Sequence, residues 1–178
     1  MKQSYDYLII GADAAGNSAV GQIRRNDKEA TIGILEKTSI ISYWACGLPY
    51  AISGSVKSFD DLIHFDGPTF GEKTKSDVLL NHEAVGVDFD SRSVRVKTPD
   101  GEKEVSYGKL MIGTGAPAIR LPFVDYSSGR VFELKTVPDG RAIQEFIQKN
   151  GAKRAAIIGA GYIGLEAAET FREMGLSV

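Results

Sequence analysis

The stretch that decides the fold is YLIIGADAAG, which covers residues 7–16 near the N-terminus. Residues 7–10 form a short apolar run that ends at a glycine, a pattern that favours a buried parallel strand. A helical pattern follows over residues 14–25, and a second apolar run over residues 31–35 closes on Glu36. Strand, helix and strand within about 30 residues predict a βαβ unit, and hence an α/β fold with a parallel sheet.

The turn between the first strand and the helix has the context of a dinucleotide-binding loop. It reads Gly11-Ala12-Asp13-Ala14-Ala15-Gly16. Asp13 stands where a second glycine is usual, and its carboxylate would crowd a phosphate unless it pointed away. Glu36 lies 20 residues after Gly16, at the position of the acid that binds a ribose hydroxyl pair in this fold. Turn and acid together favour nucleotide binding over a bare scaffold turn.

A second glycine turn occurs near the end of the chain, and it reads Gly159-Ala160-Gly161-Tyr162-Ile163-Gly164. It follows a predicted strand over residues 155–158 and opens a predicted helix over residues 164–174. This context favours a second dinucleotide site over a glycine-rich turn without a ligand. The accompanying acid would lie about 20 residues past Gly164, beyond Val178. We therefore expect an N-terminal part of a longer protein, with its second nucleotide site incomplete.

Between the two glycine turns the sequence predicts a small antiparallel meander. The predicted strands cover residues 78–80, 84–89, 93–97 and 104–107, and residues 109–112 form a further buried strand. Short helices are expected at residues 46–52 and 68–75, and an amphipathic helix at residues 139–149.

The composition excludes several classes of function. With 21 Lys and Arg against 23 Asp and Glu, the net charge is -2, which gives no electrostatic reason for a nucleic-acid or membrane partner. No run approaches the roughly 18 apolar residues that span a bilayer. A single cysteine excludes an intrachain disulfide and suits a reducing compartment. We expect a cytoplasmic protein, and we expect no metal site.

The single cysteine, Cys46, lies in the segment SYWACGLPY, residues 42–50. If a helix starts here, its backbone amides would favour the thiolate form; the alternative is a buried, inert cysteine. Position 51, where the partner of a C-x-x-x-x-C redox pair would stand, is Ala51. A redox cycle at Cys46 would therefore need an external thiol or a sulfenic acid.

Taken together, these features resemble the FAD-dependent pyridine nucleotide–disulfide oxidoreductases. The closest match is the single-cysteine branch, which holds coenzyme A disulfide reductases, NADH oxidases and peroxidases, and persulfide reductases. The resemblance covers the whole chain. It rests on the first turn with Glu36-Lys37, Ser42-x-x-x-Cys46-Gly47-Leu48-Pro49-Tyr50, the meander, Ile112-Gly113-Thr114-Gly115-Ala116, and Gly161-Tyr162-Ile163-Gly164-Leu165-Glu166.

The resemblance implies a Rossmann-like FAD-binding domain with a parallel sheet and an inserted antiparallel β-meander, followed by the start of a second Rossmann domain. Residues 1–120 would belong to the FAD domain, residues 121–150 would form a connecting loop and helix, and residues 151–178 would be the first βα unit of the NAD(P)H domain. Electrons would run from NADH or NADPH through FAD to Cys46 and on to a disulfide or persulfide. The full-length protein would be a homodimer, and a chain of this length would be catalytically incompetent alone.

The family's functional residues can be transferred position by position. Cys46 would be the catalytic nucleophile. The residues that the resemblance assigns to the cofactors are Gly11, Ala12, Asp13, Ala14, Ala15, Gly16, Glu36, Lys37, Ala84, Thr114, Gly115, Ala116, Gly159, Gly161, Tyr162, Ile163, Gly164 and Glu166.

The substrate side resembles the coenzyme A disulfide reductases, which contact coenzyme A through a Gln-Ile-Arg-Arg segment and a serine four residues before the cysteine. The residues thereby assigned to a substrate such as coenzyme A disulfide are Gln22, Arg25 and Ser42, and Ser18 on the same predicted helix is assigned with them. Two observations weaken the assignment: the asparagine often found before the cysteine is Ala45 here, and Arg24-Arg25 also suit the C-terminal end of a helix dipole.

An NADH oxidase or peroxidase is the alternative activity within the family. Peroxidase-type members resemble one another in carrying a histidine in the first glycine turn, and the matching position here is Ala14. We interpret the two histidines, His64 and His82, as surface or packing residues. The sequence therefore favours the reductase over the oxidase.

Overall fold

The computed structural model of the protein describes residues 1–178, and they form two compact units. The first unit contains residues 1–43 and 63–115, and the second contains residues 44–62 and 116–178. Each is described by itself.

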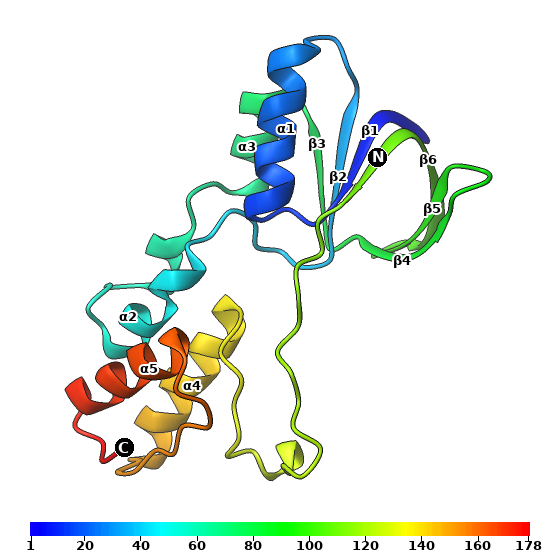
Figure 1. Cartoon of the computed structure of the whole chain (residues 1–178). Helices are drawn as coiled ribbons and strands as arrows, with labels where there is room; N and C mark the ends of the chain where they lie inside the picture. The colour runs from blue at the N-terminus through cyan, green and yellow to red at the C-terminus, as the bar shows by residue number, and fades with distance from the viewer. The chain divides into compact units, whose positions relative to one another are not determined.

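A six-stranded sheet in the order β3-β2-β1-β6-β5-β4 forms the centre of the first unit (Figure 1). β1 pairs in parallel with β2 and β6, and β2 with β3, whereas the β4–β5 and β5–β6 pairs are antiparallel. The strands are β1 (Ser4–Ile10), β2 (Ile32–Glu36), β3 (Asp77–Leu80), β4 (Glu83–Asp88), β5 (Ser93–Thr98) and β6 (Gly101–Ile112). This is the expected mixed sheet, a parallel part continued by an antiparallel meander.

Both faces of the parallel part are buried. Ile9 of β1 packs into a cluster with Val20 of α1 (Ala14–Asn26) and Phe70 of α3 (Gly67–Thr74), the two helices on one side of the sheet (Figure 1). Leu8 and Ile10 belong to the second cluster, which includes the apolar side chains of β5 and β6. Because successive side chains of a strand point to opposite faces, the apolar run of β1 supplies both cores.

Two details of the predicted meander are wrong. Residues 78–80 belong to β3, which pairs in parallel with β2 and extends the main sheet instead of entering the meander. Residues 104–107 and 109–112 are one continuous strand, β6, which pairs with β5 over its first half and with β1 over its second. Gly108 lies within this strand and does not interrupt it. A Cβ at this position would lie 2.8 Å from the carbonyl oxygen of Asp6, so the glycine lets β1 approach.

Three helices and three short 3₁₀ turns make up the second unit. The helices are α2 (Leu48–Ser53), α4 (Val137–Asn150) and α5 (Tyr162–Glu173), and the turns are η1 (Ala45–Gly47), η2 (Phe59–Leu62) and η3 (Tyr126–Ser128). α2 packs against both α4 and α5. Gly140 of α4 lies against the Phe59 ring, where a Cβ would come within 2.6 Å. The amide of Gln144 donates to the carbonyls of Ala51 and Ile52 and so closes the end of α2.

The strand predicted over residues 155–158 is not formed. One parallel bridge joins Arg154 to Ser177, and Ile158 is 73% exposed. A parallel strand needs a neighbour that pairs along its length, and here the pairing with Ser177 extends only over residues 153–155. The helix predicted from residue 164 begins two residues earlier, at Tyr162. None of the helices has the length and apolar character that crossing a bilayer requires.

Candidate functional site

The first glycine turn is built so that backbone comes close to backbone. Gly11 has φ +101°, a left-handed conformation that side chains rarely adopt. A Cβ added there would overlap the carbonyl oxygen of Gly113, and a Cβ added at Gly16 would overlap the carbonyl oxygen of Gly11. Both glycines are therefore required for β1, the turn and α1 to pack as they do.

The second glycine turn repeats this geometry. Gly159 has φ +111°, and a Cβ at Gly164 would overlap the carbonyl oxygen of Gly159. Gly161 differs, because a Cβ there would meet nothing within 4 Å and the backbone φ is -76°. Packing within the chain does not require a glycine at this middle position, whereas room for a ligand would.

In the first turn, Asp13 occupies that middle position. Its backbone is extended, with φ -109°, and its side chain makes no hydrogen bond to the first turn of α1. The first turn of α1 also contains no acidic residue. No side chain caps this helix, so its N-terminal amides remain a site for an anion. The residues present therefore fit a pyrophosphate, provided that the Asp13 carboxylate points away from it.

Glu36 lies where the sequence places it, at the end of β2 beside the turn. Its Oε2 accepts a hydrogen bond of 3.0 Å from the Ala12 amide. Its Oε1 accepts from the amide and the hydroxyl of Thr38, at 2.9 and 2.8 Å. These hydrogen bonds fix the orientation of Glu36. Because each carboxylate oxygen offers two lone-pair positions and Oε2 accepts only one bond, Glu36 can still accept a hydrogen bond from a ribose hydroxyl. Thr38, which sequence reasoning missed, orients the acid.

The other proposed cofactor residues of the first unit are distributed around this turn or farther from it. Lys37 and Thr114 are exposed, and Thr114 follows Gly113, whose carbonyl lies against Gly11. Ala84 of β4 is half-buried and packs on the cluster beneath the meander. Ala116 and the residues of the second turn belong to the second unit.

Three proposed substrate residues share one exposed face of α1. Ser18, Gln22 and Arg25 follow one another at helical spacing and are all exposed. Arg25 donates a 2.6 Å hydrogen bond to Oε1 of Gln22. The structure thus brings Ser18, Gln22 and Arg25 together, and Arg25 is the one cation among them.

Arg24 has a structural task that the sequence left open. Its guanidinium donates to five backbone carbonyl oxygens, those of Asp27, Lys28, Ala30, Thr74 and Lys75. These bonds join the end of α1 to the loop before β2 and to the end of α3. Arg24 is therefore engaged within the first unit, whereas its neighbour Arg25 faces solvent.

Cys46 is exposed, so the buried alternative is wrong. The helix expected from residue 46 is a 3₁₀ turn, η1, that runs into α2. The Trp44 amide donates to the carbonyl of Leu62, and a Cβ on Gly47 would lie 2.5 Å from the Leu62 side chain. The thiol thus lies on a short turn at the surface of the second unit, while the first glycine turn and Glu36 belong to the first unit.

The two histidines are placed outside the glycine turns. His82 contacts the carbonyl of Leu80 through Nδ1 at 2.6 Å, and its amide donates to the carbonyl of Glu36. The ring of His64 packs edge-on against Phe65. No group of three or more His, Cys, Asp and Glu side chains is arranged to hold a metal ion.

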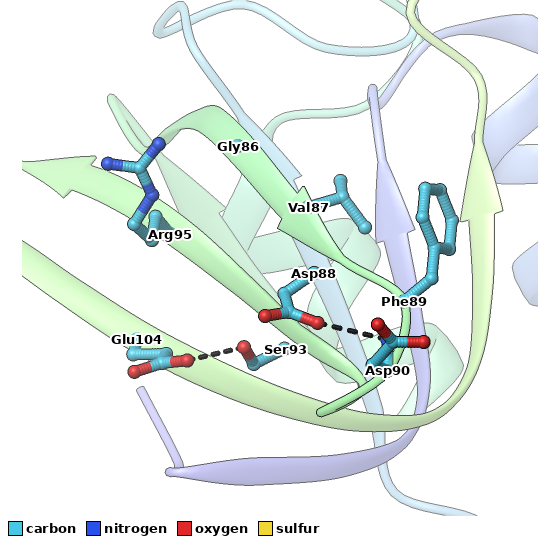
Figure 2. A pocket seen from close by; sticks show the side chains of 8 residues that line it. All are labelled: Gly86, Val87, Asp88, Phe89, Asp90, Ser93, Arg95 and Glu104. Atoms are coloured by element: carbon cyan, nitrogen blue, oxygen red, sulfur yellow. Dashed lines mark hydrogen bonds between the residues drawn. The ribbon is translucent and has the colours of Figure 1, made fainter.

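A surface hollow lies over the meander (Figure 2), and none of the predicted site residues lines it. It is lined by Gly86, Val87, Asp88, Phe89, Asp90, Ser93, Arg95 and Glu104. Ser93 donates to Glu104, and the Asp90 amide donates to Asp88. Three carboxyl groups against one guanidinium do not suit a phosphate-bearing ligand, so this hollow is no candidate for the nucleotide.

The parallel sheet, the glycine turn and the acid at the end of the next strand define a dinucleotide-binding domain of the Rossmann type. The chain belongs to the pyridine nucleotide-disulphide oxidoreductase family, which matches residues 5–178.

Curated relatives match almost the whole chain. It is 38% identical over 173 residues to a coenzyme A disulfide reductase of Staphylococcus haemolyticus and 36% identical over 172 residues to an NADH oxidase of Methanocaldococcus jannaschii. Each match covers 96% of this chain but only 39% and 38% of the relative. The chain therefore spans well under half the length of these relatives.

Solved structures agree on the fold. A NAD-dependent persulfide reductase from A. fulgidus matches with a TM-score of 0.91 and 33% identity, over 96% of this chain and 32% of that chain. A reduced CoADR-RHD from Bacillus anthracis matches with a TM-score of 0.91 and 27% identity, over 97% of this chain and 32% of that chain.

Proposed function

We propose that the chain is the N-terminal part of a flavoprotein that uses NADH or NADPH to reduce coenzyme A disulfide, or a related disulfide or persulfide, through Cys46. The observation that carries the proposal is the pairing of a glycine turn closed on Glu36 with an exposed thiol ten residues later in the chain. In this proposal residues 1–120 belong to the FAD domain, residues 121–150 connect, and residues 151–178 begin the NAD(P)H domain.

Most of the residues proposed to hold FAD belong to the first unit. The amides of residues 11–16 and of the uncapped start of α1 would bind the pyrophosphate, and Glu36 would bind the adenosine ribose. Lys37, Ala84, Thr114, Gly115 and Ala116 would line the rest of the cofactor. When bound, the flavin supplies a two-electron carrier between the nicotinamide and the sulfur chemistry. The turn at residues 159–164 would bind the pyrophosphate of NAD(P)H, with Glu166 on the flavin side.

The chain's own contribution to the chemistry is the Cys46 thiol. Its thiolate would attack one sulfur of the substrate disulfide, so that a mixed disulfide with Cys46 forms and the other half leaves as a thiolate. Exposure of Cys46 supports this role, since a bulky disulfide must reach the sulfur. No second cysteine is present to form an internal disulfide.

Recognition of the substrate would fall to the exposed face of α1 and to Ser42. Arg25 carries a permanent charge and can donate two hydrogen bonds to a phosphate of coenzyme A. Gln22 and Ser18 offer an amide and a hydroxyl on the same face. The names of two relatives, coenzyme A disulfide reductase and NAD(P)H sulfur oxidoreductase (CoA-dependent), support coenzyme A as the recognised group.

The whole protein is proposed to be a cytoplasmic homodimer without a nucleic-acid or membrane partner. The single cysteine supports a reducing compartment. The net charge of -2 offers no attraction to polyanions.

An NADH oxidase is the second candidate, because the relative from Methanocaldococcus jannaschii carries that name at 36% identity. Ala14 argues against a peroxidase-type oxidase, because no imidazole stands in the first turn to exchange protons with a bound oxygen species. Assays of the full-length protein with coenzyme A disulfide, polysulfide, oxygen and peroxide in parallel would separate the two.

The chain itself offers a direct test. Purified protein is titrated with FAD and, separately, incubated with coenzyme A disulfide and analysed by mass spectrometry, with Cys46→Ser as the control. We expect a yellow complex with altered flavin fluorescence, and one coenzyme A adduct that the control lacks. Absence of both would overturn the proposal. We also expect no steady-state NAD(P)H oxidation at about 1 per second or faster from this chain alone.

A further inference from the structure

The backbone of one residue joins three segments of the first unit. Ala12 lies in the first glycine turn and is only 1% exposed. Its amide donates to Glu36 at 3.0 Å, and its carbonyl accepts from Nδ2 of Asn17 at 2.9 Å and from the amide of Ser42 at 3.1 Å. The backbone conformation of this one residue therefore relates the nucleotide turn, the ribose acid and the proposed substrate serine.

Ser42 is held in an unusual backbone conformation. Its φ is +49°, in the left-handed region that side-chain-bearing residues seldom occupy. Its amide is bound to the carbonyl of Ala12, and its carbonyl accepts a 2.7 Å hydrogen bond from the amide of His64. Strained conformations of this kind persist only where the surroundings fix them, and they cluster at functional positions.

Asn17 is an energetically unfavourable residue at its position. Its amide Nδ2 donates to Ala12, whereas Oδ1 is buried without a hydrogen-bond partner among the protein atoms. A buried acceptor without a partner destabilises the fold, and an apolar side chain of similar size would avoid that cost. An apolar side chain of that size could not make the hydrogen bond from Nδ2 to the Ala12 carbonyl.

We propose that Asn17 is a positioning residue: it fixes the carbonyl of Ala12, and this carbonyl in turn holds Ser42 in its left-handed conformation. Asn17 thereby sets the direction of the Ser42 side chain. The significance for the substrate rests on the proposed function, in which Ser42 contacts coenzyme A. The link itself connects the nucleotide turn to the substrate serine through hydrogen bonds within one unit.

The test measures hydrogen exchange at the Ser42 amide in the purified chain. Asn17→Ala removes the donor, and Asn17→Asp keeps the shape but replaces the donor by an acceptor. The matched control is Asn26→Ala, because Asn26 lies on the same helix and its Nδ2 donates at 2.9 Å to the carbonyl of Gln22. We expect exchange at Ser42 to be about tenfold faster in both Asn17 variants and unchanged in the control. Unchanged exchange in the Asn17 variants overturns the proposal.

A second variant separates positioning from a general effect on folding. Glycine adopts φ +49° without strain, so Ser42→Gly in the Asn17→Ala background should restore protection of the amide at position 42. Loss of helix packing at Asn17 would not be rescued in this way, and an unrescued double variant overturns the proposal. Hydrogen exchange at the protected amides of β1 reports whether each variant is folded. If Asn17→Ala is unfolded, Ser42→Gly is combined with Asn17→Asp instead, and the rescue is measured on that double variant.

An FAD titration of the same proteins separates the two proposals. A chain that binds no FAD counts against the proposed function, whereas exchange at Ser42 still decides the role of Asn17. If both proposals hold, the Asn17 variants bind FAD more weakly than the Asn26 control.

Discussion

Arg24 shows how one side chain can connect parts of the chain that the sequence leaves separate. Its five bonds to backbone carbonyls tie the end of α1 to the loop before β2 and to the end of α3. A lysine keeps the charge but presents a single ammonium with three donors, so it cannot reach carbonyls spread around a planar guanidinium.

We therefore expect Arg24→Lys to lower the free energy of unfolding by about 2 kcal/mol, measured by urea denaturation. Arg25→Lys is the control, because Arg25 is exposed and bonds only to Gln22; its effect should stay within about 0.5 kcal/mol. Equal midpoints for the two variants would show that the carbonyl bonds of Arg24 contribute little.

The glycines of the two turns differ in what they do. A Cβ at Gly16 would overlap the Gly11 carbonyl oxygen, whereas a Cβ at Gly161 would meet nothing within 4 Å. Gly16→Ala should cost about 3 kcal/mol or more in stability, and Gly161→Ala should change stability by less than about 0.5 kcal/mol. Thermal unfolding of the two variants checks this, and a large loss in Gly161→Ala would mean that Gly161 is required by the fold.

At the scale of single residues, the sequence was informative where backbone geometry restricts the residue type. Gly11, Gly16 and Glu36 lie together as predicted, because a tight turn and a strand end are local features. Arg24 and Asn17 were not identified, because their roles depend on carbonyl groups brought together only by the folded unit. No local pattern distinguishes Arg24 from Arg25.

At the scale of elements, most helices and strands were predicted to within two residues at either end, because their apolar periodicity is local. Strand pairing was harder. Residues 78–80 were assigned to the meander, yet they pair with β2 as the third parallel strand. Residues 104–107 and 109–112 were predicted as separate strands, although Gly108 between them allows β6 to continue against β1. Pairing depends on which segments meet in space, and composition along the chain does not record it.

The helix that follows Cys46 offers a test at this scale. α2 has six residues, too few to be stable alone, and Gln144 of α4 donates to its carbonyls at Ala51 and Ile52 at 3.0 and 3.1 Å. Gln144→Ala should lower the free energy of unfolding by about 1 to 2 kcal/mol. It should also increase proteolytic cleavage near α2.

Gln148 provides the matched control, since it lies one turn later on α4 and is exposed. Gln148→Ala should leave both stability and the cleavage pattern unchanged. If Gln144→Ala behaved like Gln148→Ala, packing alone would hold α2 and the two hydrogen bonds would be dispensable.

At the scale of the whole molecule, four exposed aspartates predict how stability depends on acid. Hydrogen bonds from neighbouring amides and hydroxyls hold the pKa values of their carboxyl groups below the ordinary value of 3.8. These are Asp6 bound by Thr31, Asp66 by Thr69, Asp88 by Ser91 and Asp125 by Ser127. A pKa that is lower in the folded state stabilises the fold above about pH 4, and this contribution is lost as pH falls below it. Urea midpoints should therefore be level near neutrality and decrease below pH 4.

The alkaline limit should come from one buried phenol. Burial raises the pKa of Tyr5 to about 12 from 10.0. The hydrogen bond from the Lys2 amide lowers this pKa, and the Asp77 carboxylate, which accepts a hydrogen bond from the phenol, raises it further. Because the folded pKa is the higher one, Tyr5 stabilises the fold fully below pH 10, and this contribution is lost as pH rises from about 10 to about 12. The urea midpoint of Tyr5→Phe should be lower than that of the unmodified chain at neutral pH. Because phenylalanine has no proton to lose, this midpoint should decline less over the interval. Parallel declines in the two proteins would assign the alkaline loss to other groups.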